Sequence, residues 1–153
     1  MTAAFSAPLL TMYDHAASKA LGGDFWRVCK SFEFVTANGR RIQVPAGYLT
    51  DGASVPRAAW SFIPPWGKYG QAAVTHDLLC EYLSLSVDGK PTSITRAECD
   101  AILLEAMQAL GVDNGTAKII SDAVDLYRVF SHTDKPTATP EKRALESAWT
   151  PVF

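Results

Sequence analysis

Hydrophobic and polar residues alternate along the first third of the chain, over residues 25–49. The alternation is regular over 32–36, breaks at the turn dipeptide Asn38-Gly39, and resumes over 41–44. This pattern predicts a β-hairpin, because alternate residues of a strand point to opposite faces of a sheet. A proline and a glycine then interrupt the ladder, so residues 48–50 are expected to form only a short edge segment.

The remainder of the chain follows the 3.6-residue period of α-helices. Apolar positions recur on one face over residues 69–84, which predicts a first helix. Thr95, with Glu98 three residues later, forms a capping box that opens a second helix, and Gly111 ends it. A third helix is expected over 115–131. Its predicted apolar side consists of Ile119, Ile120, Ala123, Val124, Tyr127 and Phe130.

Together these elements predict a single α+β domain over residues 1–153. A small N-terminal antiparallel hairpin or sheet packs on a three-helix C-terminal half, and the length of 153 residues suits one hydrophobic core. We place that core at about residues 24–131. The Thr- and Pro-rich segment 132–153 is expected to be a surface arm that docks through Trp149 and Phe153.

The composition argues against nucleic-acid binding, membrane insertion and secretion. The chain has 14 Lys and Arg against 16 Asp and Glu, a net charge of −2, so no global basic field favours nucleic acid or anionic membrane, and we expect no nucleic-acid partner. No apolar run approaches the roughly 20 residues of a transmembrane helix. The N-terminus lacks the cationic start of a signal peptide, so we expect synthesis in a cytoplasm with no leader removed.

The cysteines argue against a disulfide framework or a structural zinc site. Cys29, Cys80 and Cys99 are odd in number and lack C-x-x-C spacing. We expect reduced, buried thiols, and a Cys80–Cys99 bridge is the alternative.

The residues with the clearest chemistry are His76 and Asp100. His76 lies on the apolar face of the first helix, and Asp100 lies beside the apolar stripe of the second, where an unpaired carboxylate would be costly. Helices joined by a loop of about ten residues are expected to be neighbours, so the two side chains should face each other. An imidazole oriented by a carboxylate can act as a general base. Alternatively, the pair is structural and only stabilises the packing of the two helices.

Acidic and aromatic residues surround this pair in the sequence. Asp77 follows the histidine directly, and with Asp51 from the preceding loop it could hold a hard cation such as calcium. Ser54 and Arg57 could clamp a substrate or phosphate, or Ser54 could cap a helix while Arg57 pairs with Asp51. Aromatic residues near the two consecutive prolines could form a substrate-binding rim or belong to the core. The expected substrate-binding residues are Ser54, Arg57, Trp60 and Tyr69.

Several fixed segments resemble a known family. The stretches VPAGYLTDGASVPRAAW, PPWGKYGQAAVTHDLLCEYL and RAECDAILLEAMQALGV, in this order, are similar to the domain-of-unknown-function family number 1353, common in bacteriophages and prophages. The resemblance covers roughly residues 32–130. It implies a phage or prophage origin, hence synthesis in a bacterial cytoplasm and possible incorporation into a virion. Cys80 stands where that family usually has tyrosine.

A second, local resemblance concerns the chemistry. The pattern AAVTHD followed by CD is similar to the helix pair of secretory and parvoviral phospholipases A2. It implies that His76 is the general base, that Asp77 is a calcium ligand, and that Asp100 orients the histidine. The glycine-rich calcium loop of those enzymes is not reproduced, because Thr50-Asp51-Gly52-Ala53 contains one glycine.

Two functions are therefore expected from the sequence. The first is a phage- or prophage-encoded protein of a virion, tail or lysis module, with other virion proteins as partners and a buried His-Asp-Asp site. The second is a calcium-dependent acyl hydrolase, or another hydrolase acting on an envelope lipid or polymer, with His76 as its base.

Overall fold

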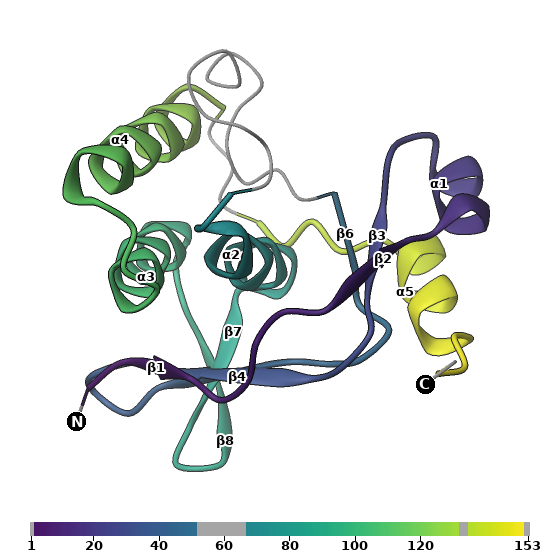
Figure 1. The fold of residues 1–153 in the computed structure, drawn as a ribbon, viewed down its shortest axis with the longest axis horizontal. Helices are drawn as coiled ribbons and strands as arrows, with labels where there is room; N and C mark the ends of the chain where they lie inside the picture. The colour runs from purple at the N-terminus through teal and green to yellow at the C-terminus, as the bar shows by residue number, and fades with distance from the viewer. Residues whose placement is uncertain (1, 52–66, 132–134, 152–153) are drawn as a thin grey trace.

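The computed structural model describes residues 2–51, 67–131 and 135–151. Strands come first and helices dominate the second half (Figure 1), so the predicted α+β class is confirmed. The elements are, in chain order, β1 (Ala4–Phe5), β2 (Thr11–Tyr13), α1 (His15–Leu21), β3 (Trp26–Val28), β4 (Phe32–Val35), β5 (Arg41–Val44), β6 (Leu49–Thr50), α2 (Gly70–Tyr82), β7 (Ser84–Val87), β8 (Lys90–Ser93), α3 (Arg96–Ala109), α4 (Asn114–Ser131) and α5 (Pro140–Ser147).

The strands form two antiparallel sheets. The larger has the order β1-β4-β5-β7-β8 and the smaller the order β2-β3-β6. The predicted hairpin is the β4–β5 pair, in which Phe34 lies opposite Ile42. Gly39 has a φ of 85° in its turn, a conformation that glycine adopts without a Cβ clash. The pattern of alternation therefore located both strands.

The helices α2 and α3 lie side by side over one face of the larger sheet, and α4 lies beside α3 (Figure 1). At the other end of the molecule, α1 and α5 lie next to the smaller sheet. The described ends of the chain lie far apart along the longest axis. This arrangement leaves α2 in the centre, between the two sheets and α3.

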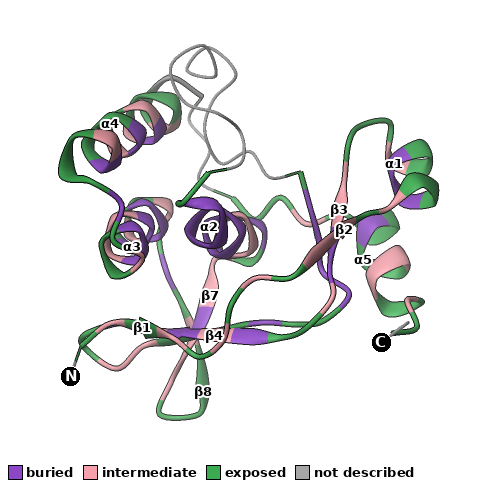
Figure 2. Cartoon of the chain, viewed as in Figure 1, coloured by how far each residue is buried: buried purple, intermediate pink, exposed green. Residues whose placement is uncertain are grey.

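Burial of α2 is more complete than the predicted single apolar stripe. All residues from Gly70 to His76 are buried, including the polar Gln71 and Thr75 (Figure 2). A helix with neighbours on several sides is buried around most of its circumference, so its sequence shows little one-sided pattern. His76 on this helix is therefore deep in the molecule.

The predicted apolar side of α4 is wrong at two positions. Ile120 and Val124 are buried together with Ala117, but Ile119 is 54% exposed and Tyr127 is 52% exposed. The helix is apolar over more of its surface than it buries within the described chain, so hydrophobicity alone did not fix the buried face.

Other elements were not predicted. The connection between the first two predicted helices, expected to be a loop of about ten residues, contains the β7–β8 hairpin, and Asp88 and Gly89 in its turn have φ of 51° and 78°. The strands β1 and β2 and helix α1 were also missed. The C-terminal segment contains α5, and Trp149 after it is half-buried, while Phe153 lies outside the described residues. Among the described residues, no helix combines the length and apolarity that crossing a membrane requires.

Candidate active site

The site is assembled where α2 and α3 pack together. Thr95 caps α3, with its hydroxyl accepting from the Glu98 N–H and the Glu98 carboxylate returning to the Thr95 backbone, so the predicted capping box is confirmed. This cap fixes the start of α3. It thereby places Asp100 in the helix's second turn, facing His76 of α2.

The imidazole and the carboxylate are in direct contact. His76 Nε2 lies 2.7 Å from Asp100 Oδ1, and both side chains are 2% exposed. In a neutral imidazole, the nitrogen that faces a carboxylate carries the proton and the other nitrogen has the free lone pair. The contact therefore assigns the proton to Nε2 and leaves Nδ1 as the basic nitrogen.

Two arginines compensate the charge of Asp100. Arg96 Nε, one helical turn earlier on α3, lies 3.8 Å from Asp100 Oδ1. Arg128 Nε of α4 lies 3.5 Å from Asp100 Oδ2. A buried carboxylate needs such partners, because desolvation of an unpaired charge costs several kcal/mol or more. Neither arginine was predicted from the sequence. The i,i+4 spacing of Arg96 could have revealed the first, whereas Arg128 is far along the chain.

The neighbouring thiol does not complete a nucleophilic triad. Cys80 Sγ lies 3.4 Å from His76 Nε2 and 3.9 Å from Nδ1, so it is nearer to the nitrogen already bonded to Asp100. A hydrogen bond to Cys99 and burial raise the pKa of the Cys80 thiol well above its usual range. A protonated thiol is a poor nucleophile. The structure has Cys80 and Cys99 as free, buried cysteines, as the sequence suggested, whereas Cys29 is free but only half-buried.

The same three side chains are poorly suited to hold a metal ion. The ligand atoms of His76, Cys80 and Asp100 lie within 4.8 Å of one another. A thiol ligand must ionise to bind a metal, however, and the raised pKa of Cys80 opposes ionisation. A metal would also share Asp100 with the two nearby guanidinium groups. We therefore interpret the group as a His–Asp pair with an adjacent thiol.

Asp77, which follows His76 directly, lies in a different environment from Asp100. Asp77 Oδ2 accepts a hydrogen bond of 3.1 Å from the Thr50 hydroxyl at the end of β6. Burial and the negative charge of Asp51 raise the pKa of Asp77 to about 7, the positive Lys142 opposes the shift, and Glu81 adds to it. Asp51 itself is exposed. The structure thus brings the two predicted cation ligands into electrostatic contact.

An ionic cluster, consisting of Tyr48, Glu81, Lys142 and Glu146, joins α2 to α5 beside Asp77. Lys142 donates a hydrogen bond to Glu81 Oε1 and lies 3.3 Å from Glu146 Oε2. The Tyr48 hydroxyl donates to Glu81 Oε1 at 3.1 Å. This cluster was not predicted from the sequence. The one local signal was the i,i+4 pair of Lys142 and Glu146, because Glu81 is remote in the chain.

The remaining predicted site residues are separated from this geometry. Tyr69 is 4% exposed within the main core, and its buried hydroxyl has no hydrogen-bond partner among the described residues. Its side chain thus occupies the position that the core alternative expected. Ser54, Arg57 and Trp60 lie outside the described residues.

Comparison with known proteins places the chain in a family. It is 34% identical over 104 residues to a protein of Sinorhizobium fredii (strain NBRC 101917 / NGR234) named "Uncharacterized protein y4jT", a match covering 67% of this chain and 28% of that relative. The chain therefore spans less than a third of the relative's length. No solved structure matches the chain significantly. The model of the family described as "Protein of unknown function (DUF1353)" matches residues 26–124, which include both the His76–Asp100 pair and Asp77, and the chain belongs to this family.

Proposed function

We propose that the chain is a hydrolase in which His76 is the general base and Asp100 orients it, with a phospholipid ester as the leading substrate. The observation that carries this proposal is the 2.7 Å contact between His76 Nε2 and Asp100 Oδ1. It fixes one nitrogen of the ring on a carboxylate and leaves the other to take a proton from water.

Each residue has a distinct role in the proposed reaction. His76 Nδ1 accepts the proton of the attacking water, and Asp100 stabilises the imidazolium ion that results. Arg96 and Arg128 hold the Asp100 carboxylate from two sides. Water attack suits this arrangement better than covalent catalysis, because the nearby Cys80 thiol is protonated and contacts the wrong nitrogen.

Burial sets a condition on this reaction. Both His76 and Asp100 are 2% exposed, so a substrate can reach Nδ1 only if the surrounding chain opens. Such opening before chemistry is common in enzymes that exclude water from their sites. We therefore expect the rate to depend on this opening as well as on the base.

Asp77 and Asp51 are the residues that would hold a calcium ion. Carboxylate oxygens are the ligands that Ca²⁺ prefers. Burial and the negative charge of Asp51 raise the pKa of Asp77, and a divalent cation would offset both effects. Lys142 already supplies part of this compensation, so the fit is for a cation beside Asp51 rather than within the ionic cluster. A bound calcium ion would supply Lewis-acid polarisation of an ester carbonyl.

The biological setting is the second part of the proposal. A hydrolase of envelope lipid, or of another envelope polymer, would serve a phage or prophage in its tail or lysis module. The family resemblance is the support for this setting. The expected association with virion proteins stays a prediction.

The test is release of fatty acid from mixed phosphatidylcholine and phosphatidylglycerol vesicles by the purified chain, with calcium and then with chelator. We expect activity that the chelator abolishes and that His76→Ala lowers by about 10²-fold or more. His15→Ala is the matched control, because His15 is exposed on α1, and it should leave the rate unchanged.

Two results would contradict the proposal. The first is activity that survives His76→Ala in a variant with an unchanged circular dichroism spectrum. The second is wild-type protein that releases no fatty acid and degrades no other envelope polymer, such as peptidoglycan, while folding normally. In that case the His76–Asp100 pair is a structural contact between α2 and α3.

A further inference from the structure

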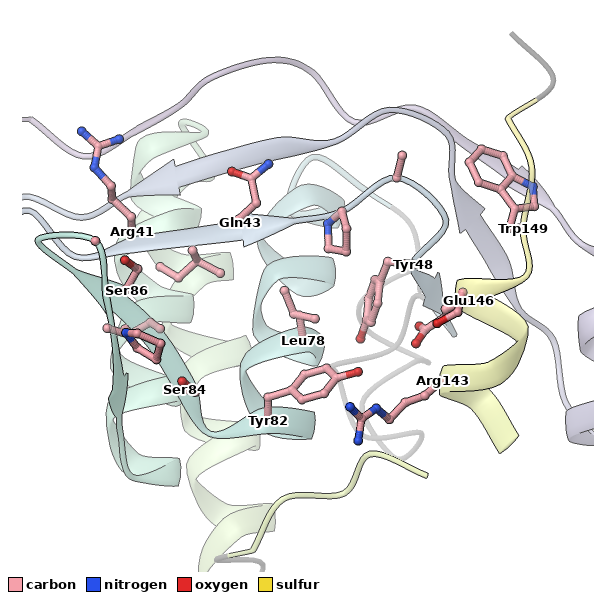
Figure 3. Close-up of a pocket in the computed structure, with 17 residues that line it drawn as sticks. Arg41, Gln43, Tyr48, Leu78, Tyr82, Ser84, Ser86, Arg143, Glu146 and Trp149 are labelled. Carbon is pink, nitrogen blue, oxygen red and sulfur yellow. The ribbon is translucent and has the colours of Figure 1, made fainter. Parts of the chain in front are cut away.

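A surface pocket of about 830 Å³ lies where the larger sheet splits (Figure 3). The strands β5 and β7 share one register pair, Arg41 opposite Ser86. Continuing this antiparallel register would place Gln43 opposite Ser84, but these residues are not paired, and both line the pocket. The two strands therefore separate just where the pocket opens.

Both walls of this split direct backbone groups toward the gap. In the β4–β5 hairpin, the Thr36 N–H donates to the Arg40 carbonyl, so by alternation the polar backbone groups of Gln43 point away from β4 and toward β7. In the β7–β8 hairpin, the Ile94 N–H donates to the Leu83 carbonyl, and the same alternation points the groups of Ser84 toward β5. The split thus presents two short strand edges.

The rim of the pocket combines aromatic surface with positive charge. Tyr82 is 36% exposed at the end of α2, and the Arg143 guanidinium lies 5.7 Å from the centroid of its ring. Arg143 is exposed, and no carboxylate lies within ion-pair distance of it in the described part of the chain. The acid of the pocket, Glu146, is already engaged by the Leu49 N–H and by Lys142. The uncompensated charge at the rim is therefore positive.

We propose that this pocket binds an extended peptide segment that carries an acidic side chain. The peptide backbone pairs with Gln43 or Ser84 at the split, as in other cases of strand addition to an exposed sheet edge. Its acidic side chain reaches Arg143, and alternate side chains pack on Leu78 and Tyr82. The pocket should therefore prefer an extended peptide backbone and a negatively charged side chain.

This inference is independent of the proposed hydrolase. His76 and Leu78 are two residues apart on α2, which places them on nearly opposite sides of the helix at about 100° per residue. The peptide pocket and the His76–Asp100 pair can therefore be tested by separate variants. Failure of one proposal leaves the other standing.

The test is titration of the ¹⁵N-labelled full chain, followed by amide chemical shifts, with a blocked hexapeptide of three Glu-Val repeats. We expect shifts at the Gln43 and Ser84 amides and about tenfold weaker binding of the corresponding Lys-Val peptide. Replacing the central valine by proline should also weaken binding, because proline cannot donate a backbone hydrogen bond. Arg143→Ala should weaken binding by about tenfold, whereas Lys118→Ala on α4 should not.

Three outcomes would overturn the proposal. One is the absence of shifts at Gln43 and Ser84 at millimolar peptide. Another is equal binding of the acidic, basic and proline-containing peptides. The third is an identical shift pattern with acetate alone, which would show that Arg143 binds a small anion without strand pairing.

Discussion

At the scale of single residues, the hydrogen bond between His76 and Asp100 determines what the neighbouring side chains can do. Because Nε2 is held by the carboxylate, Cys80 meets a nitrogen that is already occupied. The thiol therefore fills space between α2 and α3 as a small buried apolar group, 7% exposed. In the proposed reaction, therefore, His76 activates water and Cys80 is not the nucleophile.

We predict that Cys80→Ala retains hydrolytic activity within about tenfold of wild type, because the thiol takes no part in the proposed chemistry. The same substitution should lower the free energy of unfolding by about 1 kcal/mol, since it leaves a small cavity. Initial rates and urea denaturation measure the two effects, with Cys29→Ala as the control. A loss of rate as large as that of His76→Ala would instead identify Cys80 as a nucleophile.

The Asp77 carboxyl gives a prediction for pH dependence. Its folded pKa of about 7 lies above the reference value of 3.8, so the folded state binds the proton more tightly than the unfolded state. The free energy of unfolding should therefore fall as pH rises from about 4 to about 8, by up to about 4 kcal/mol, and level off above that range. The measurement is urea denaturation of wild type and Asp77→Asn between pH 4 and pH 8.

The comparison of wild type with Asp77→Asn isolates this group from other titrations. Wild type should lose stability relative to the variant as pH rises, and Asp122→Asn, an exposed site on α4, should follow wild type. Calcium at pH 8 should raise the melting temperature of wild type more than that of Asp77→Asn. A difference that is constant with pH would show that the carboxyl is ionised throughout, contrary to the environment described above.

At the scale of elements, the sequence predicted those parts of the fold that depend on local pattern. The β4–β5 hairpin follows from alternation and its Asn38-Gly39 turn, and α3 follows from its capping box. The short edge segment predicted over residues 48–50 is β6, whereas β1 and β2, with two and three residues, were missed. Segments that short show too little periodicity for recognition, because they are held by pairing with remote strands.

In the candidate site, too, local pattern predicted some residues and missed those that are remote in the chain. Apolar spacing located the His76–Asp100 pair, because a carboxylate beside an apolar stripe requires a nearby partner. Arg128 of α4 pairs with Asp100 on α3, and Lys142 of α5 pairs with Glu81 on α2, and no local sequence pattern connects either pair. The exposed faces of α4 could not be predicted either, because which of its apolar residues are buried depends on how it packs on α3.

The contact of α5 with α2 gives a prediction at this scale. Lys142→Met removes the ammonium group shared by Glu81 and Glu146, and Glu81 Oε2 is already buried with no hydrogen-bond partner among the described residues. Leaving buried carboxylates without a counter-charge should lower the free energy of unfolding by about 3 kcal/mol. Urea denaturation measures this loss, and Lys118→Met, at an exposed pair on α4, should cost less than about 0.5 kcal/mol.

At the scale of the whole molecule, the region matched by the family model depends on elements outside it. Residues 26–124 contain His76, Asp77 and Asp100 but not Arg128, and buried Arg27 has two of its partners outside this region. Its guanidinium donates to Asp14, which caps α1, and to the Leu145 carbonyl on α5. Glu81 likewise depends on Lys142. The flanking segments therefore complete the charge balance of the matched core.

We predict that a fragment of residues 26–124 is much less stable than the full chain. It leaves Arg27 without Asp14 and Glu81 without Lys142, and each loss of a counter-charge costs about 3 kcal/mol, comparable to a large part of a domain's total stability. Thermal unfolding followed by circular dichroism should show a melting temperature lowered by more than about 10 °C. Lys118→Met in the full chain, at an exposed ion pair on α4, is the control and should melt nearly as the wild-type chain does. If the 26–124 fragment has the same melting temperature as the full chain, the matched region folds without any contribution from α1 and α5.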